Sequence, residues 1–413
     1  MAFLTALLFA GSPAYAAEPA KSGQGDLRAV EVNITGDSDQ TRFVLTLSGP
    51  VEARAFLLER PDRVIVDLPQ VAFNLPAADE TPEGKKPATL VSSYRYGLFA
   101  QGRSRIVIDL KEPALATKVV NEAATHGTIL TIELTKADRA TYSRAAMQPM
   151  VEAAAALSQT ENARVAAARA SATAAEERDN RPLIMLDPGH GGVDPGAMRF
   201  GLQEKDLVYD FAQRFRDRIE ATGRYRVQMT RNDDSFVSLG GRVRIAREAK
   251  ADLLISIHAD SLSRNSTVRG ATVYTSSNTP TDAESAQLAA KENLADQIAG
   301  VEVEEDTDDV VGILAELTRR ETRTLSSYFA DGTIEVLRKE VHLTRNPHRS
   351  AGFIVLRAPD VPSVLIELGY ISSEQDVALL TSEEWQGKTI TALLKALDKF
   401  FARQIAQQQT DSG

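Results

Sequence analysis

The sequence contains no cysteine and only five histidines among its 413 residues. The absence of cysteine excludes disulfide scaffolds, cysteine-ligated zinc sites, iron–sulfur clusters and a thiol nucleophile. Basic residues are also in deficit, because 47 Lys and Arg stand against 57 Asp and Glu, which gives a net charge of −10. Nucleic acids and anionic membranes attract clustered Lys and Arg, so neither is expected as the main partner. Any chemistry must therefore come from histidines, carboxylates and hydroxyls.

Long hydrophobic runs are missing as well. The apolar stretch from Ala2 to Ala10 is far shorter than the roughly 20 residues that span a bilayer, so no transmembrane anchor is expected. No Lys or Arg precedes this stretch, but Ala14-Tyr15-Ala16 follows it, as in a secretory signal peptide. We therefore expect a signal peptide at residues 1–16 and export by the general secretory route. An exported chain without cysteine suits the bacterial periplasm.

The composition otherwise indicates a folded chain of two or three domains, since 43% of the residues are hydrophobic and 25% are charged. Between residues 27 and 136, short segments such as Arg42–Leu47 and Arg63–Leu68 alternate polar and apolar side chains. This alternation predicts an all-β sandwich. Its single histidine, His126, stands alone beside Gly127 in an expected turn. We interpret the region as a binding or targeting module.

Residues 137–181 are rich in Ala, Glu, Arg and Gln and contain few large apolar side chains. High helix propensity without an apolar stripe predicts an Ala-rich, semi-rigid linker, partly helical and partly disordered. From residue 182 to about 406, apolar strands alternate with amphipathic helices, which predicts an α/β domain with a central, mostly parallel sheet flanked by helices. The expected strands are Leu183–Leu186, Leu253–Ile257, Gly270–Thr275, Gly352–Leu356 and Val364–Ile366.

Chemically competent side chains stand where these strands end. His190 follows the first strand in the sequence Asp187-Pro188-Gly189-His190-Gly191-Gly192, His258 ends the second, and Glu367 ends the last. Glu204 begins an amphipathic helix between the first two strands. Because the carboxyl ends of neighbouring strands meet at one edge of a sheet, these four side chains are expected to converge. Two histidines and two carboxylates fit a catalytic zinc site with an open position for water.

Four segments in order, Leu186–Gly192, Glu204, Ser256–Asp260 and Ile366–Tyr370, resemble the zinc-dependent N-acetylmuramoyl-L-alanine amidases of bacterial cell division. The resemblance covers about residues 182 to 405. The β-module, which contains Arg60–Leu68, is similar to the AMIN domains that direct such amidases to septal peptidoglycan.

The resemblance implies that His190, Glu204 and His258 bind one zinc ion and that Glu367 is the catalytic carboxylate. The implied reaction is hydrolysis of the bond between N-acetylmuramic acid and L-alanine in peptidoglycan, for septal splitting and daughter-cell separation. Two alternatives stay open: a zinc peptidase that cuts within the stem peptide, and a non-catalytic peptidoglycan-binding protein. A monomer is expected.

An acidic insertion is expected at about residues 279–325, with nine carboxylates and no Lys or Arg between Lys291 and Arg319. It is either a solvated loop between two helices or a regulatory element. The resemblance implies the second, a helix whose glutamate occupies the open zinc position until an activator with a degenerate LytM domain displaces it. Glu292 is the candidate inhibitory ligand, and the alternatives are Glu302, Glu304 and Glu305.

Four further residues have open roles. Asp187 and Asp260 lie beside the motif histidines and either orient their rings or serve turns and caps. His342 and His348 either line the cleft or are ordinary surface histidines.

Overall fold

The computed structural model describes residues 27–75, 89–125, 127–146, 151–176, 179–261, 268–301 and 313–411. The predictions for the signal peptide, for His126, and for Glu302, Glu304 and Glu305 concern residues outside these ranges. Among the described residues, none of the helices combines the length and the apolar character needed to cross a membrane.

The N-terminal module is a β-sandwich, as the alternating segments predicted. One sheet has the order β5-β1-β2-β9-β8, with β5 (Ala72–Phe73), β1 (Arg28–Gly36), β2 (Gln40–Leu47), β9 (Gly127–Lys136) and β8 (Ala114–Ala124). The other has the order β3-β4-β7-β6, with β3 (Arg54–Leu58), β4 (Arg63–Pro69), β7 (Arg103–Leu110) and β6 (Val91–Ala100). Their inward-facing side chains, among them Phe43, Val66 and Ile132, form one buried core.

The C-terminal domain has the predicted mixed architecture. Its sheet has the order β13-β10-β14-β17-β15-β16, with β13 (Arg226–Met229), β10 (Leu183–Pro188), β14 (Leu253–His258), β17 (Ser363–Glu367), β15 (Ala271–Ser276) and β16 (Leu343–Ala351). Neighbouring strands are parallel except β15 and β17, which are antiparallel. The short strands β11 (Met198–Arg199) and β12 (Leu202–Gln203) form a separate hairpin.

Helices cover both faces of this sheet. Ile184 and Leu186 of β10 pack with α3 (Glu204–Ala221), α7 (Ile313–Leu337) and α9 (Glu383–Asp411) on one face. Leu183 and Met185, which point the other way, pack with α4 (Leu239–Glu248). The remaining helices of the domain are α5 (Ala283–Glu292), α6 (Ala295–Ile298) and α8 (Glu374–Leu380). Because β10, β14 and β17 are parallel neighbours in this sheet, their carboxyl ends lie together at one edge.

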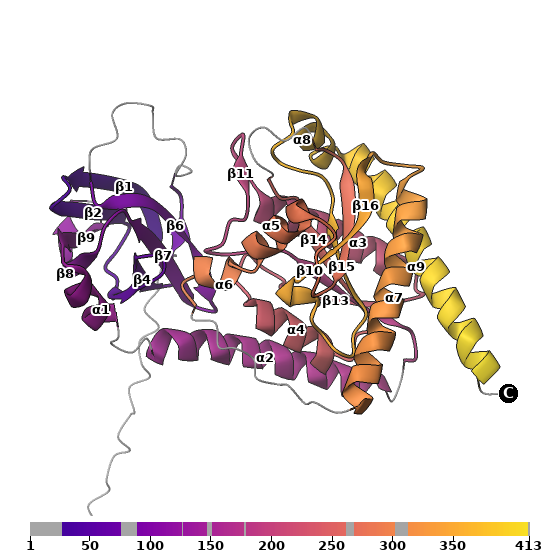
Figure 1. The fold of residues 1–413 in the computed structure, drawn as a ribbon. Helices are drawn as coiled ribbons and strands as arrows, with labels where there is room; N and C mark the ends of the chain where they lie inside the picture. The colour runs from indigo at the N-terminus through magenta and orange to yellow at the C-terminus, as the bar shows by residue number, and fades with distance from the viewer. Residues whose placement is uncertain are drawn as a thin grey trace, which may run out of the picture.

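The segment predicted as a linker contains α1 (Arg139–Ala146) and α2 (Val151–Glu176). The predicted semi-rigid linker is helical here, but its helix α2 also packs, because it lies along both domains (Figure 1) and buries Leu157 and Ala168. Glu161 is also buried, and it accepts hydrogen bonds from the Ser238 backbone at 2.8 Å and from Arg244 at 2.7 Å. Small alanines and one paired carboxylate therefore replace the large apolar stripe that a packed helix usually shows.

The predicted strand at Gly352–Leu356 is also wrong, since Ile354–Leu356 is a 3-10 turn and the strand β16 precedes it. β16 contains Pro347 and several polar residues, and it lies at the edge of the sheet with β15 as its partner. An edge strand tolerates proline and a polar sequence because one side of its backbone needs no partner strand. Because of this composition, β16 lacks the alternating or apolar pattern from which strands are predicted.

Candidate active site

The loop after β10 holds His190 in an unusual backbone conformation. His190 has a φ of 57°, in the left-handed region that non-glycine residues seldom adopt. Two buried arginines hold this backbone in place. Arg242 donates hydrogen bonds to the His190 carbonyl at 2.6 Å and to the Pro188 carbonyl at 2.8 Å, and Arg231 donates to the Gly189 carbonyl at 3.0 Å. These contacts offset the cost of the strained conformation.

A glycine in the same loop lets the two histidines approach each other. A Cβ atom on Gly189 would lie 2.4 Å from Cε1 of His258, so no larger residue fits there without moving the ring. The ring centroids of His190 and His258 are 5.0 Å apart. The Pro-Gly-His sequence therefore ends the strand and makes room for the second histidine.

Four side chains meet at this point. Nε2 of His190 lies 3.1 Å from Oε2 of Glu204 and 3.5 Å from Oε2 of Glu292. Nδ1 of His258 lies 3.1 Å from Oε1 of Glu204 and 3.3 Å from Oε2 of Glu292. Ligand atoms about 2.0–2.1 Å from a tetrahedral zinc ion lie roughly 3.3–3.4 Å from one another. These nitrogen–oxygen distances are close to the spacing between ligands of a tetrahedral zinc ion; Glu292 faces both histidines with one oxygen, whereas Glu204 faces each histidine with a different oxygen.

Further contacts fix the orientation of these groups. Nδ1 of His190 lies 2.8 Å from Oδ2 of Asp194, which leaves Nε2 facing the cluster. The Glu204 carboxylate accepts hydrogen bonds at 2.9 Å from the backbone of Ala197 and of Ala259. Asp194 is a residue that the sequence reasoning missed, although its position four residues after His190 offered a signal. A carboxylate on the second nitrogen is the usual way to set the tautomer of a metal-binding histidine.

The electrostatics of the cluster follow from burial and charge. Burial opposes the charged form of His190, but Glu204, Asp194 and Glu292 outweigh it and raise the pKa of His190 well above its usual range. Burial also opposes ionisation of Glu204, but His190 and His258 outweigh it and hold the pKa of Glu204 well below its usual range. Such opposed shifts in one buried cluster are typical of functional sites.

The cluster also fits a metal ion chemically. Nε2 of His190 is buried and has no hydrogen-bond partner among the described residues. Among these residues, His190, His258 and Glu292 each offer a ligand atom within 4.8 Å of the other two. Two imidazoles with oxygen ligands suit zinc among the common divalent metals.

Glu367 lies beside this cluster. It pairs directly with His258 in the register of β14 and β17. One of its oxygens, Oε2, accepts a hydrogen bond from the Asp260 backbone at 3.0 Å. Oε1 is buried without a hydrogen-bond partner in the described part of the chain. Burial and the carboxylates of Glu204 and Asp260 raise the pKa of Glu367 well above its usual range.

Helix α5 closes the site from outside. Its last residue, Glu292, is only 5% exposed, and burial raises its pKa to about 7, although His190 and His258 act in the opposite direction. The cavity between this helix and the histidines has a volume of about 10 Å³. That is about the lower limit for one water molecule, so protein atoms fill the space between α5 and the two histidines.

The structure gives partners for three of the four residues with open roles. Asp187 accepts hydrogen bonds from Thr230, Ser256 and Arg242, and Asp260 forms an ion pair with Lys291. Neither contacts an imidazole in a hydrogen bond of the described residues. Nδ1 of His348 lies 2.8 Å from Asp331, and the side chain of His342 is exposed.

Comparisons with known proteins show which family the chain resembles along its length. Residues 184–399 match the family model described as N-acetylmuramoyl-L-alanine amidase, and residues 31–139 match the AMIN domain. The N-acetylmuramoyl-L-alanine amidase AmiC of Escherichia coli is 30% identical over 385 residues, which covers 91% of this chain and 90% of that protein. AmiC of Neisseria meningitidis is 30% identical over 376 residues, 89% of this chain and 88% of that protein.

Among solved structures, an N-acetylmuramoyl-L-alanine amidase from Clostridium difficile is 20% identical with a TM-score of 0.40, and the match covers 54% of this chain and 98% of that one. The match to the family model and the two AmiC relatives define the class. The chain belongs to the N-acetylmuramoyl-L-alanine amidase family and carries an AMIN domain. It is an enzyme of that activity.

Proposed function

We propose that this amidase uses zinc to hydrolyse the bond between N-acetylmuramic acid and L-alanine in peptidoglycan. The proposed setting is the periplasm, at the division septum, where the reaction separates daughter cells. The observation that carries the proposal is the convergence of His190, His258 and Glu204 beside Glu367. His190, Glu204 and His258 would hold the zinc ion.

In this proposal, Glu367 moves protons during the reaction. Bound zinc would polarise the scissile carbonyl and lower the pKa of water in the site towards 7. Oε1 of Glu367, which lacks a partner among the described residues, is available to accept a proton from the attacking water. A carbon–oxygen bond forms as the carbon–nitrogen bond breaks, and Glu367 passes the proton to the departing L-alanine nitrogen. No nucleophilic side chain is needed.

Analysis of the reaction products tests this proposal. The zinc-loaded protein, incubated with purified peptidoglycan sacculi, should release stem peptides that begin with a free L-alanine amine. Removing the metal with a chelator should stop the release, and added zinc should restore it. A peptidase acting within the stem would leave L-alanine attached to the glycan. A non-catalytic binding protein would release nothing, and either result would contradict the proposal.

We also propose that the enzyme is autoinhibited by Glu292. Two observations support this role: Oε2 of Glu292 lies 3.5 Å from Nε2 of His190 and 3.3 Å from Nδ1 of His258, and only about 10 Å³ is free between α5 and these histidines. A tethered carboxylate competes with water at an effective concentration on the order of millimolar. In this proposal, an activator with a degenerate LytM domain displaces α5.

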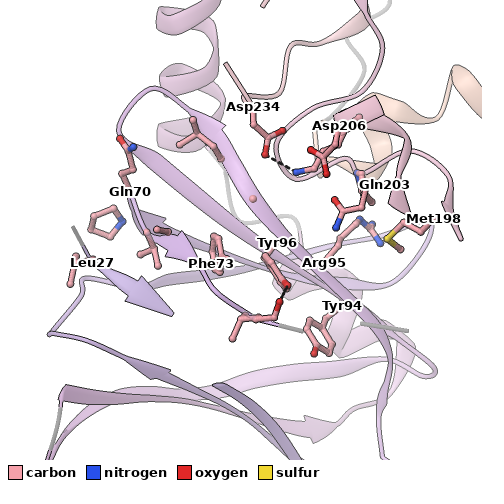
Figure 2. A pocket seen from close by; sticks show the side chains of 18 of the residues that line it. Leu27, Gln70, Phe73, Tyr94, Arg95, Tyr96, Met198, Gln203, Asp206 and Asp234 are labelled. Atoms are coloured by element: carbon pink, nitrogen blue, oxygen red, sulfur yellow. Dashed lines mark hydrogen bonds and ion pairs between the residues drawn. The ribbon is translucent and has the colours of Figure 1, made fainter. Parts of the chain in front are cut away.

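For the AMIN domain we propose targeting to peptidoglycan through a cleft between the two domains. The cleft has a volume of about 870 Å³. Figure 2 shows Phe73 and Tyr96 on its AMIN side, with ring centroids 4.6 Å apart, and Gln203, Asp206 and Asp234 on its catalytic side. Aromatic faces and polar groups together suit the rings and hydroxyls of a glycan strand.

Replacing Phe73 tests the cleft. In an E367Q background, which keeps the sacculi intact, F73S should weaken cosedimentation with sacculi by about threefold to tenfold, the size of one aromatic contact. Val30 is an apolar residue of β1 that is 50% exposed and does not line the cleft, so V30S is the matched control. Equal apparent dissociation constants for the two variants, with unchanged melting temperatures, would contradict the proposal.

A further inference from the structure

One sheet of the AMIN sandwich is apolar on its outer face as well as on its inner face. In the sheet β3-β4-β7-β6, inward-facing residues such as Val64, Val66 and Ile106 fill the sandwich core. The alternate residues Leu58, Ile65, Phe99 and Val107 belong to a second buried cluster. This cluster also contains Phe236 of the catalytic domain and Ala299, which follows α6. The outer face is therefore a binding surface for the catalytic domain.

Two arginines of this face bind the end of α6. Arg63 of β4 donates a hydrogen bond to the Gln297 carbonyl, and Arg95 of β6 donates one to the Ile298 carbonyl at 3.1 Å. The side chain of Gln297 donates in return to the Arg60 carbonyl. The last carbonyls of a helix have no partner within it and carry partial negative charge, so guanidinium groups satisfy them well.

Arg105 of β7 is the third arginine that binds this part of the chain. It donates to the Ala299 carbonyl at 2.9 Å and to the Gly300 carbonyl at 3.0 Å. The guanidinium is 1% exposed, lies 3.4 Å from the centroid of the Phe99 ring, and forms a two-point ion pair with Asp67 at 2.6 and 2.9 Å. Aromatic and carboxylate neighbours thus hold this arginine in the position where it meets α6.

The α6 segment, which we define as residues 295–300, also packs closely on the outer face of this sheet. Gly300 has a φ of +70°, and a Cβ atom there would lie 2.8 Å from Cδ1 of Ile65 and 3.4 Å from Cδ1 of Leu58. The backbone of the segment therefore packs directly on the AMIN side chains. In Figure 1, α6 lies between the sandwich and the catalytic domain.

The same α6 segment continues directly from the helix that closes the active site. Glu292 ends α5, and Gln297 is already bound to the AMIN domain. The chain between them is tied to the catalytic domain, since Asn293 donates to the Gly352 carbonyl at 2.9 Å and Asp296 accepts from the Leu239 backbone at 2.9 Å.

We infer that the AMIN domain has a second function: Arg63, Arg95 and Arg105 form a clamp that holds α6, and with it α5, in the closed position. This inference rests on the proposed inhibitory role of Glu292. Arg95 also lines the interdomain cleft (Figure 2), so an occupant of the cleft reaches one arginine of the clamp. The clamp thus couples two events: binding of a ligand in the interdomain cleft and opening of the active site.

The double variant R63A/R95A tests the clamp and leaves the buried Arg105–Asp67 pair intact. Without activator, its release of dye from labelled peptidoglycan should rise at least about tenfold, the effect of losing one charge-assisted hydrogen bond. Hydrogen exchange of backbone amides at residues 283–301 should become faster. Arg42 pairs with Glu133 at 3.2 Å on the other sheet, so R42A is the matched control and should change neither measurement. Unchanged release by a folded R63A/R95A overturns the inference.

A second variant changes a residue outside the AMIN domain, so its effect does not depend on misfolding of the sandwich. G300N should wedge the interface, because asparagine tolerates a positive φ but its side chain meets Ile65. Gly223 has a φ of +66° with no atom within 4 Å of its Cβ position, so G223N is the control. G300N should raise basal release as R63A/R95A does, and G223N should not.

Comparison with E292Q separates the proposed arginine clamp from the proposed inhibitory role of Glu292. If E292Q raises basal release but R63A/R95A and G300N do not, the clamp is wrong and autoinhibition stands. If E292Q raises nothing, the inhibitory role of Glu292 is wrong. Faster exchange in R63A/R95A would then show only that the arginines order α6, and the inference would be overturned as well.

Discussion

Replacing Glu367 with glutamine should lower peptidoglycan hydrolysis by roughly a hundredfold to ten-thousandfold, the usual contribution of a general acid–base group. Glutamine has nearly the same shape, and its carbonyl oxygen can still accept the hydrogen bond that Glu367 receives from the Asp260 backbone at 3.0 Å. It cannot take a proton from water or return one to the leaving amine. The fold should therefore persist while the proton transfers fail. Initial rates of peptide release from sacculi measure the loss.

The zinc content of the same variant separates catalysis from metal binding. Glu367 lies outside the group of His190, His258 and Glu204, so E367Q should keep one zinc ion per chain. H190A removes a proposed ligand and should lose the metal. Elemental analysis of both purified variants, with circular dichroism to show folding, makes the comparison. Substantial activity in E367Q, or full zinc content in H190A, would contradict the proposed roles.

The sequence predicted the positions of the proposed site residues because strand ends are readable from composition. Apolar segments that stop at Pro188, at His258 and at Glu367 mark the carboxyl edge of the sheet. Glu204 is the first residue of α3, as the amphipathic pattern indicated. These features depend on local sequence and on one topological rule, that parallel strands end at the same edge.

The residues that hold the site in shape could not be predicted in this way. Arg231 and Arg242 are far from His190 in sequence, and nothing in their local sequence shows that they bind its loop. The same is true of Arg105, which reads as an ordinary polar residue of an alternating strand. Its contact with Ala299 depends on how two domains pack. Long-range contacts of this kind leave no periodic signal in the chain.

Removing the Glu292 carboxylate should raise the activity measured without activator. Oε2 of Glu292 lies 3.5 Å from Nε2 of His190 and 3.3 Å from Nδ1 of His258, within reach of the proposed metal position. E292Q replaces a charged ligand with a weak neutral one, so water should take its place. We expect basal hydrolysis to rise at least about tenfold, the change that 1.4 kcal/mol produces. Dye release from labelled peptidoglycan, measured without activator, gives the rate.

The rise in E292Q should be limited because other contacts keep α5 in place. Lys291 forms an ion pair with Asp260, and Asn293 donates a hydrogen bond to the Gly352 carbonyl at 2.9 Å. The helix therefore still covers the active site when the Glu292 carboxylate is gone. Combining E292Q with R63A/R95A should therefore give more activity than either change alone.

A spectroscopic measurement distinguishes ligand loss from simple loosening of the helix. In the cobalt-substituted protein, E292Q should alter the visible absorption bands, because one ligand of the metal changes. E316Q removes an exposed carboxylate of α7 that pairs only loosely with Arg319, at 4.0 Å, so its spectrum and basal rate should match the parent protein. An unchanged E292Q spectrum with an unchanged rate, in a folded protein, would contradict the inhibitory role. A changed rate with an unchanged spectrum would mean that Glu292 holds α5 closed through the histidines without binding the metal.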